Sequence, residues 1–502
     1  MNCANSSSDL LEDEKGWSIL QNKAPLLIYK KQGLFNIKNG GMYMSKKQIH
    51  LNGFIQNSPS PHSTGLWKHE KDQGTSHNRL DYWTETAKTL ERGKFDALFI
   101  ADVLGTYSVY GNSHDAAAKH AVQLPAHDPT LVIPAMAAVT KHLGFAPTIS
   151  TTYAQPYSLA RQLSTLDHLT EGRVAWNVVT SYLESEAVNM GLEQRLPKEM
   201  RYNRADEFLE VVYKLWEDSW EADAVQYDRE KDTFADPDKV HMINHRGEFF
   251  NVPGPHLVEP SPQRTPVLFQ AGASPKGRDF AAKHAEAVFT KNHSLEALTA
   301  YVKDIRERTV AQGREADDVK VFPMILPIIG ETEAEAYEKY EALQDSVSYE
   351  GTASLLSGHT GIDFSQYDPD QYIEDIETEA VQGNLDMYTK DPTRKWTLRE
   401  AIKNHGLGNG TVKFIGTPAQ IADRIEEWAT EGDADGFNIA QTYSPGTFEE
   451  FVDLVVPELQ ARGIYRTEYE GETLRENMFG KGRKHLADNH PAKRPSLAGQ
   501  WY

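Results

Sequence analysis

Short apolar runs alternate with amphipathic stretches between residues 48 and 181, and again between 266 and 462. A short apolar run bounded by turn residues is typical of a buried strand, whereas an apolar residue at every third or fourth position is typical of a helix packed along one face. The regular exchange of the two patterns predicts a parallel sheet whose successive strands are connected by helices.

The alternation yields eight strand-like runs, and eight alternating units favour a (β/α)8 barrel (TIM barrel) of the α/β class over an open, doubly wound sheet. The predicted strands are 48–55, 98–101, 144–152, 174–179, 266–270, 287–290, 319–329 and 436–439. The predicted helices are 78–92, 128–142, 156–169, 204–216, 276–284, 295–312, 333–345, 417–430 and 447–462.

The rest of the chain is assigned around this barrel. We expect residues 1–46 to form a partly disordered extension, 47–471 the barrel and 472–502 a C-terminal tail. Two long insertions, about 182–262 and 346–411, explain the excess length, and a hairpin is expected around Arg246-Gly247. The first insertion follows the fourth strand, so it is expected on the catalytic face of the barrel.

The composition excludes several classes of partner and site but does not identify the function. The formal net charge of −21 argues against nucleic acid and anionic lipid as partners. The single cysteine, Cys3, excludes an intramolecular disulfide and a thiolate metal cluster. No apolar stretch is long enough to span a bilayer, and the polar, acidic N-terminus lacks the features of a signal or transit peptide, so a cytoplasmic location is expected.

Functional side chains of such a barrel are expected directly after the strands. The stretch FDALFIADVLG (95–105) ends its apolar run in Asp102, which is either a turn-capping acid or a functional carboxylate. Segment 144–152 supplies hydroxyls, Thr148 among them, and the segment after the first strand supplies His62 and Trp67. This set suits a polar, planar ligand but contains no nucleophile–base pair.

The segment QAGASPKGRDFA (270–281) runs from a strand through small residues into a helix that begins beside Ser274. Backbone N–H groups, the serine hydroxyl and the helix dipole together form an anion site suited to a phosphate. An ordinary serine N-cap explains the same residues equally well. Neither a Walker-type pattern nor GxGxxG is present, so a phosphate here would belong to a cofactor bound in the manner of a barrel.

Other enzyme classes find little support. HxH after the first strand and HExxH are missing, and the histidines at 114, 120 and 127 are poorly spaced for one helix face, so no metal site is predicted. The GxSxG elbow that is typical of serine hydrolases is absent from the sequence, so this enzyme class is not favoured. A glycosidase-type partner for Asp102 would have to be Glu184 or Glu186.

Five strings in matching order resemble one family: LNGFIQNSPSPHSTGLWKH, FDALFIADVLG, PYSLARQLSTLDHLTEGRVAWNVVTS, RYNRADEF and QAGASPKGRDFAAKHAEAVF. They are similar to the nitrilotriacetate/EDTA/dibenzothiophene-sulfone monooxygenases, a group of the bacterial-luciferase-like flavin barrels. The likeness runs from about residue 47 to about residue 471. It implies a (β/α)8 barrel that uses reduced FMN (FMNH₂) and O₂ to oxidise a small organic substrate.

Carried over position by position, the resemblance implies flavin contacts at Asp102, Thr148, Tyr202 and Ser274. The family usually has a histidine in a pattern like LPHDxRY, where this chain reads LPKEMRY with Lys198. A lysine neutralises a phosphate or a reduced-flavin anion, but it is no neutral imidazole acceptor. His62 and Trp67 are the substrate-side candidates, and Trp67 is also explained by packing alone. Whether Asp102 stands against the ring or holds a loop stays open.

The resemblance also implies partners. Reduced flavin would come from a separate NAD(P)H:flavin oxidoreductase, because this chain has no nicotinamide fingerprint, and a homo-oligomer is expected. A deazaflavin-type oxidoreductase of the same fold and a non-catalytic flavin-binding barrel are the alternatives. The substrate itself is not named by the sequence.

Overall fold

The protein is described by a computed structural model covering residues 11–12, 18–19, 28–30, 33–38, 41–44, 46–59, 62–272, 274–375, 386–389 and 394–493. The chain divides into two compact units, residues 1–48 and 49–502. The first unit contains a sheet of five short antiparallel strands in sequential order. These are β1 (Leu11–Glu12), β2 (Ser18–Ile19), β3 (Ile28–Lys30), β4 (Gly33–Lys38) and β5 (Gly41–Met44). The domain limits expected from the sequence stay predictions.

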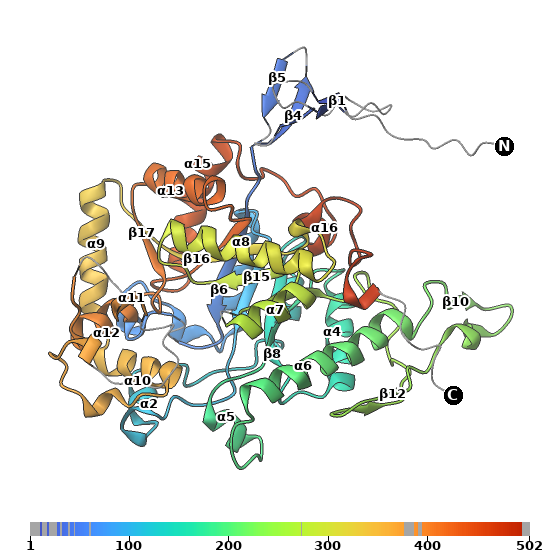
Figure 1. Ribbon diagram of the computed structural model, residues 1–502, viewed down its shortest axis with the longest axis horizontal. Helices are drawn as coiled ribbons and strands as arrows, with labels where there is room; N and C mark the ends of the chain where they lie inside the picture. The colour runs from blue at the N-terminus through green and yellow to red at the C-terminus, as the bar shows by residue number, and fades with distance from the viewer. Residues whose placement is uncertain are drawn as a thin grey trace. The chain divides into compact units, whose positions relative to one another are not determined.

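The second unit is built on a closed barrel of eight parallel strands, which confirms the predicted TIM barrel (Figure 1). Neighbours around the barrel are paired in chain order, and β15 pairs with β16 to complete the ring, while β18 pairs with β6. The strands are β6 (His50–Gln56), β7 (Ala97–Ala101), β8 (Gly144–Ser150), β9 (Ala175–Val179), β14 (Val267–Gln270), β15 (Ala287–Thr290), β16 (Lys320–Ile329) and β18 (Gly436–Ile439).

Aromatic side chains fill the barrel interior. Phe54 stacks on Phe99 and on Phe289, with 5.1 Å between ring centroids in each pair. Phe269 meets Phe99 edge-on at 5.8 Å. Such pairs contribute packing energy beyond the area that they bury. The interior is therefore a packed core, and ligand space must lie above it at the strand ends.

Helices on the outside cover the apolar faces of the strands (Figure 1). The connecting helices are α1 (Leu80–Arg92), α3 (Ile133–Ala137), α4 (Pro156–Leu169), α6 (Lys198–Tyr213), α7 (Pro275–His284), α8 (Leu295–Ala311), α9 (Glu333–Ser346), α13 (Pro418–Thr430), α14 (Gly446–Glu450) and α15 (Val456–Ala461). A short helix, α2 (Asp115–Lys119), lies in the loop after β7.

Two helices differ from the sequence prediction. The helix predicted over 128–142 shrinks to α3, because the Asp128 carboxylate accepts bonds from the backbone N–H of Thr130 at 2.7 Å and from its hydroxyl at 2.6 Å. A side chain that takes backbone donors in this way stabilises a turn in place of a helix. Helix α6 instead begins six residues before the predicted 204 and continues into a π-helical turn, Lys214–Asp218.

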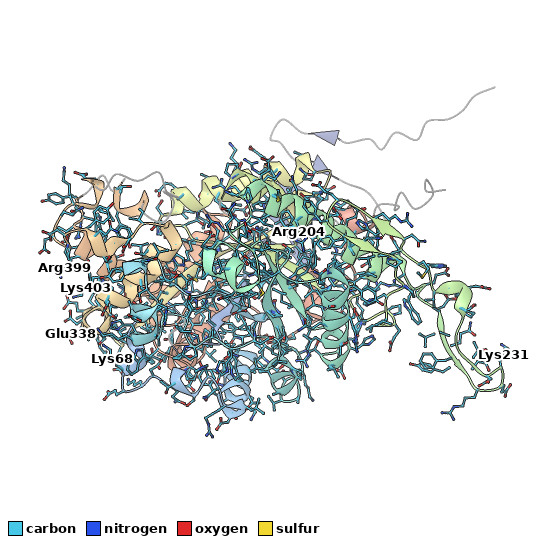
Figure 2. The ribbon with its side chains drawn as sticks, turned by 90° about the horizontal axis from the view of Figure 1, so that it is seen from below. Lys68, Arg204, Lys231, Glu338, Arg399 and Lys403 are labelled. Carbon is cyan, nitrogen blue, oxygen red and sulfur yellow. The ribbon has the colours of Figure 1, made fainter. Side chains whose placement is uncertain are left out.

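The first insertion contributes both to the mouth of the barrel and to its periphery. Helix α5 (Glu184–Asn189) follows β9 directly. Strands β10 (Val225–Asp228) and β11 (Thr233–Ala235) form an antiparallel pair, and Figure 2 shows Lys231 at the far end of this hairpin. Strands β12 (His245–Arg246) and β13 (Asn251–Val252) form a second pair, which confirms the hairpin predicted at Arg246-Gly247.

The late insertion folds into helices that are joined to the loop after β6. It contains α10 (Tyr349–Thr360), α11 (Asp386–Thr389) and α12 (Leu398–Gly406), and α10 and α12 share a small apolar core. The N–H of Thr64 donates to the Gly406 carbonyl at 3.1 Å, and the N–H of Ser348 donates to the Thr64 carbonyl at 2.9 Å. This insertion therefore lies against the carboxyl end of the barrel.

A ninth parallel strand, β17 (Val412–Gly416), follows the late insertion and was not predicted from the sequence. It pairs with the outer half of the long strand β16, from Ile325 to Ile329. Its last residue, Gly416, accepts a bond from the N–H of Gly330 at 3.2 Å. The chain thus returns to the point where it left β16.

Charged groups close the amino end of the barrel. Asp96, at the start of β7, is fully buried and accepts bonds from Arg466 at 2.7 Å and from the N–H of Leu51 at 3.0 Å. The ring of His50 lies 3.0 Å from the same carboxylate. Burial acts to raise the pKa of Asp96, but Arg466 and His50 outweigh it and lower that pKa. Asp96 is therefore ionised and holds three segments together.

A second buried ion pair joins the C-terminal segment to the barrel. Arg475, on α16 (Leu474–Phe479), is fully buried and makes two bonds to Glu286, at 2.7 and 2.9 Å. It also donates to the Thr265 carbonyl at 2.8 Å. Residues 472–493 therefore pack onto the barrel.

We predict that Asp96→Asn destabilises the protein by about 3 kcal/mol, because the substitution leaves the buried cation of Arg466 without its counter-charge. Urea unfolding followed by circular dichroism measures this change. Asp81→Asn is the matched control, since the Asp81–Arg79 pair is exposed to solvent and should contribute little. Equal effects of the two substitutions would contradict the assigned role of Asp96.

Candidate functional site

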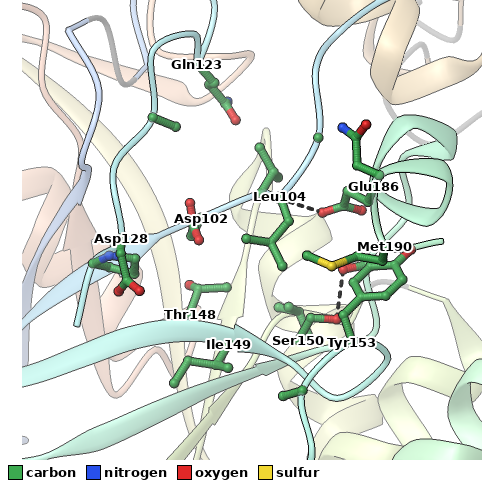
Figure 3. Close-up of a pocket in the computed structure, with 18 of the residues that line it drawn as sticks. Asp102, Leu104, Gln123, Asp128, Thr148, Ile149, Ser150, Tyr153, Glu186 and Met190 are labelled. Atoms are coloured by element: carbon green, nitrogen blue, oxygen red, sulfur yellow. Dashed lines mark hydrogen bonds between the residues drawn. The ribbon is translucent and has the colours of Figure 1, made fainter. Parts of the chain in front are cut away.

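A cavity of about 480 Å³ opens at the carboxyl ends of β7, β8 and β9 (Figure 3). Its volume lies in the range of small-molecule sites, about 300–1,000 Å³. Asp102 and Thr148 line it from neighbouring strands, so the structure brings these two sequence-predicted residues together. The loop after β7, residues 123–130 and helix α5 supply the remaining walls. Its lining combines apolar side chains with hydroxyl, amide and carboxyl groups.

The Asp102 carboxyl group has an unusual environment. It directly follows β7, and in Figure 3 it stands among the cavity-lining residues, with Asp128 and Glu186 also on the walls. Burial, aided by the charges of Asp128 and Glu186, raises the pKa of Asp102 from its ordinary 3.8 to about 7. The group therefore changes protonation near neutral pH, a property common in functional sites.

Glu186 organises the loops around this cavity. Its side chain is buried and accepts a bond from the N–H of Leu104 at 2.9 Å. It also accepts from the N–H groups of Tyr182 and Leu183, at 3.1 and 3.0 Å. The sequence presented Glu186 only as a potential second carboxylate, and its place in the first turn of α5 gave no sign of this bridging position.

Hydroxyl and amide groups form the floor. Asn177 on β9 donates to the Thr148 hydroxyl at 2.8 Å, and the Ser181 hydroxyl donates to that of Ser150 at 2.8 Å. The amide oxygens of Asn177 and Gln270 are buried and have no hydrogen-bond partner among the described residues. Neither of these two side chains is among the residues that line the cavity.

Ser274 occupies the position predicted for a phosphate-type turn. Its hydroxyl caps helix α7 by accepting the N–H of Gly277 at 3.2 Å. A Cβ on Gly272 would lie 2.8 Å from the Gly277 backbone, and a Cβ on Gly277 would lie 2.8 Å from the Tyr202 hydroxyl. Only glycine permits this close approach. The two glycines therefore allow the Gln270 and Tyr202 side chains to pack directly against the backbone of this turn.

Tyr202 connects this turn to the cavity. Its hydroxyl bonds to the side chains of Ser274 and Thr180, and Thr180 precedes the cavity-lining Ser181. Arg201 is buried beside it and donates to the Thr180 carbonyl at 3.2 Å and to the Ser181 carbonyl. Arg201 was not singled out from the sequence, although it stands next to Tyr202 in the RY pair.

The other three sequence candidates lie outside this cavity. Lys198 is exposed at the start of α6, four residues before Tyr202 and therefore on the same helix face. His62 is buried after β6, with its ring 4.4 Å from that of Phe54. Trp67 is 36% exposed on a short 3₁₀ turn.

The arrangement suits reduced FMN. The helix start at Ser274 offers an anion site, and the cavity offers hydrogen-bond groups for a polar ring. No three His, Cys, Asp or Glu side chains in the described part of the chain are grouped closely enough to hold a metal ion. Among the same residues, no helix has the length and apolarity to cross a membrane.

Comparisons with known proteins place this geometry in a family. A family model described as luciferase-like monooxygenase matches residues 60–435. A long-chain alkane monooxygenase of Geobacillus thermodenitrificans is 49% identical over 448 residues, 89% of this chain and 98% of that protein. Nitrilotriacetate monooxygenase component A of Aminobacter aminovorans is 39% identical over 442 residues, 86% and 97% of the two chains.

A solved structure agrees with these sequence matches. The crystal structure of DmoA from Hyphomicrobium sulfonivorans superposes with a TM-score of 0.86 at 45% identity, covering 91% of this chain and 97% of that one. The agreement extends through the barrel and most of its insertions, and it confirms the resemblance seen in the sequence. The chain belongs to the luciferase-like family of flavin-dependent monooxygenases.

Proposed function

We propose that this protein is the oxygenase of a two-component system, which takes FMNH₂ from a separate NAD(P)H:flavin oxidoreductase and uses O₂ to oxidise a small organic substrate. The observation that carries the proposal is the cavity of mixed polar and apolar lining at the barrel mouth, together with the Ser274-capped turn at the start of α7. A relative named component A supports a partner that supplies the flavin. A homo-oligomeric assembly is part of the same proposal.

The flavin phosphate binds at the turn before α7. The Ser274 hydroxyl and the N–H of Lys276 donate to it, since Pro275 has no N–H and the Gly277 N–H caps on Ser274, and Tyr202 orients the Ser274 hydroxyl. Lys198, one turn before Tyr202 on α6, supplies a positive charge from the solvent side. A lysine here neutralises charge without requiring a defined ring orientation.

The ring of the flavin occupies the cavity. Thr148 donates or accepts at its edge, and Asp102 stands beside it as a carboxyl group that is easily protonated. Bound FMNH₂ supplies the electrons that activate O₂. The chain itself contributes orientation and exclusion of water, for which Glu186 fixes the loops above the cavity. In this proposal, His62 and Trp67 lie on the side of the site that binds the substrate.

The relatives differ widely in substrate. One is named for long-chain alkanes, which are apolar, and another for nitrilotriacetate, which carries three carboxylates. The flavin end of the site is thus compatible with very different substrates. Specificity must come from residues outside the flavin cavity.

Oxygen consumption tests the proposal directly. Purified protein is mixed with photoreduced FMN and air-saturated buffer, and O₂ uptake and products are measured with alkanes, sulfides, sulfones and aminocarboxylates. Substrate-dependent product with one oxygen atom from ¹⁸O₂ is expected. FMN binding without any product would favour a flavin-binding barrel, and hydride transfer with a deazaflavin would favour the other alternative.

We expect Ser274→Ala to weaken FMN binding by about 1–2 kcal/mol, because it removes a hydrogen bond to a charged phosphate. Fluorescence titration of FMN measures the change. Ser294→Ala is the matched control, since Ser294 caps α8 with the same 3.2 Å geometry toward Ala297 and lies outside the proposed site. Equal FMN affinity in both variants and the wild type would remove Ser274 from the phosphate site.

Asp102 should make stability depend on pH. Between about pH 4 and pH 7 the unfolded carboxyl ionises while the native one stays protonated, so the free energy of unfolding falls as pH rises through this window. Asp102→Asn should remove this part of the slope, measured by urea unfolding at a series of pH values. Asp72, whose pKa burial raises to about 6, produces the residual slope, and Asp72→Asn serves as the control. An unchanged slope in Asp102→Asn would contradict the assignment.

A further inference from the structure

A group of nitrogen-bearing side chains lies at the mouth of the barrel. It lies outside the cavity lined by Asp102 and Thr148, which is the proposed flavin site. Lys291 follows β15 directly, and His62 follows β6. His359 comes from α10 and His405 from α12, both in the late insertion, and the rings of these two histidines lie 6.5 Å apart. Four separate segments of the chain therefore meet here, and we call these four residues the Lys291 cluster.

The ammonium group of Lys291 has little to neutralise it. It donates to the Asn409 carbonyl at 2.9 Å, which uses one of its three N–H donors. No ion pair links it to a carboxylate of the described residues. Burial lowers the pKa of Lys291 to about 8, and no acidic neighbour counteracts this decrease. A cation in such a place normally has a negative partner.

The histidines of the cluster do not provide that partner. Burial and the positive charge of Lys291 lower the pKa of His62, of His405 and of His359, that of His359 to about 3. All three rings are therefore neutral. The Nδ1 atoms of His62 and His405 are buried and have no hydrogen-bond partner among the described residues, although His405 Nε2 donates to Asn409 at 3.0 Å.

The cluster adjoins the flavin cavity through a tyrosine. The Tyr107 hydroxyl donates to Gln123, a cavity-lining residue, at 3.2 Å, and lies 3.4 Å from His359 Nε2. Lys291 and His359 keep part of their surface accessible, while His62 and His405 are 3% and 2% exposed. The buried Tyr107 side chain therefore stands between the cavity wall at Gln123 and the cluster at His359.

We propose that the Lys291 cluster binds an acidic group of the substrate, a carboxylate or a sulfonate, and thereby makes the enzyme selective for organic anions. The ammonium group of Lys291 pairs with the anion, and the imidazole N–H groups of His62 and His359 donate to its remaining oxygens, whereas His405 keeps its single N–H on Asn409. The reactive end of the substrate then points toward the cavity lined by Asp102 and Thr148. This inference rests on the proposed monooxygenase function, because it assigns the bound anion as substrate.

Equilibrium binding of matched acid and amide probes tests the cluster. Isothermal titration of the full-length protein uses octanoate against octanamide, benzoate against benzamide, and octanesulfonate to separate sulfonate from carboxylate recognition. We expect at least one acid to bind about tenfold tighter than its neutral counterpart. Lys291→Met should abolish that preference, and Lys291→Arg should retain it.

Controls separate binding from folding and from catalysis. Lys303→Met, at an exposed position on α8, should leave the preference unchanged, and thermal unfolding with FMN titration should show that the Lys291 variants remain folded. Equal binding of acid and amide, including binding of neither, or a preference that persists in Lys291→Met overturns the inference. A preference for acids without O₂ consumption would instead overturn the monooxygenase proposal and leave the anion site in place.

Discussion

Closure of the barrel is the constraint on which the rest of the structure depends. Strand β16 pairs with β15 on one edge and with β18 on the other, so the eight-stranded ring has no unpaired edge. Because all of the strands are parallel, their carboxyl ends meet at one rim, and residues far apart in the sequence become neighbours there. Residues at or just after the carboxyl ends of four different strands meet there, namely Asp102, Thr148, Ser181 and Lys291. The cavity lined by Asp102 and Thr148, which is the proposed flavin site, and the Lys291 cluster are therefore two parts of the same rim.

One strand illustrates how the two ends of the barrel differ. Asp96 and Asp102 flank β7, yet Arg466 and His50 lower the pKa of the first, whereas burial near Asp128 and Glu186 raises that of the second. At the amino end the charge is compensated and contributes to stability. At the carboxyl end it is left uncompensated, which costs stability and produces a group that titrates near neutral pH. An ionised structural acid and an acid that titrates near neutral pH thus stand six positions apart in the chain.

The sequence predicted what depends on local pattern. Strand ends follow from apolar runs, so Asp102 and Thr148 were placed correctly at the rim, and the turn at Ser274 was visible from its small residues and helix start. The Lys291 cluster and β17 were missed because they depend on how the late insertion, which lacks a strong periodic pattern, returns to the barrel. The assignment of flavin came from the family resemblance, since hydroxyls and one acid alone do not specify a cofactor.

The hydrogen bond between Gly330 and Gly416 bears on how new substrate specificities arise. The chain leaves the barrel and re-enters it at points joined by one hydrogen bond, so residues 331–415 form an inserted unit with adjacent ends. Such a unit is exchangeable between related proteins at little cost in loop closure, because the barrel on either side keeps its geometry. It carries His359 and His405 but none of the residues assigned to the flavin. Recombination at these two glycines would transplant two members of the Lys291 cluster while Asp102, Thr148, Tyr202 and Ser274 stay in place.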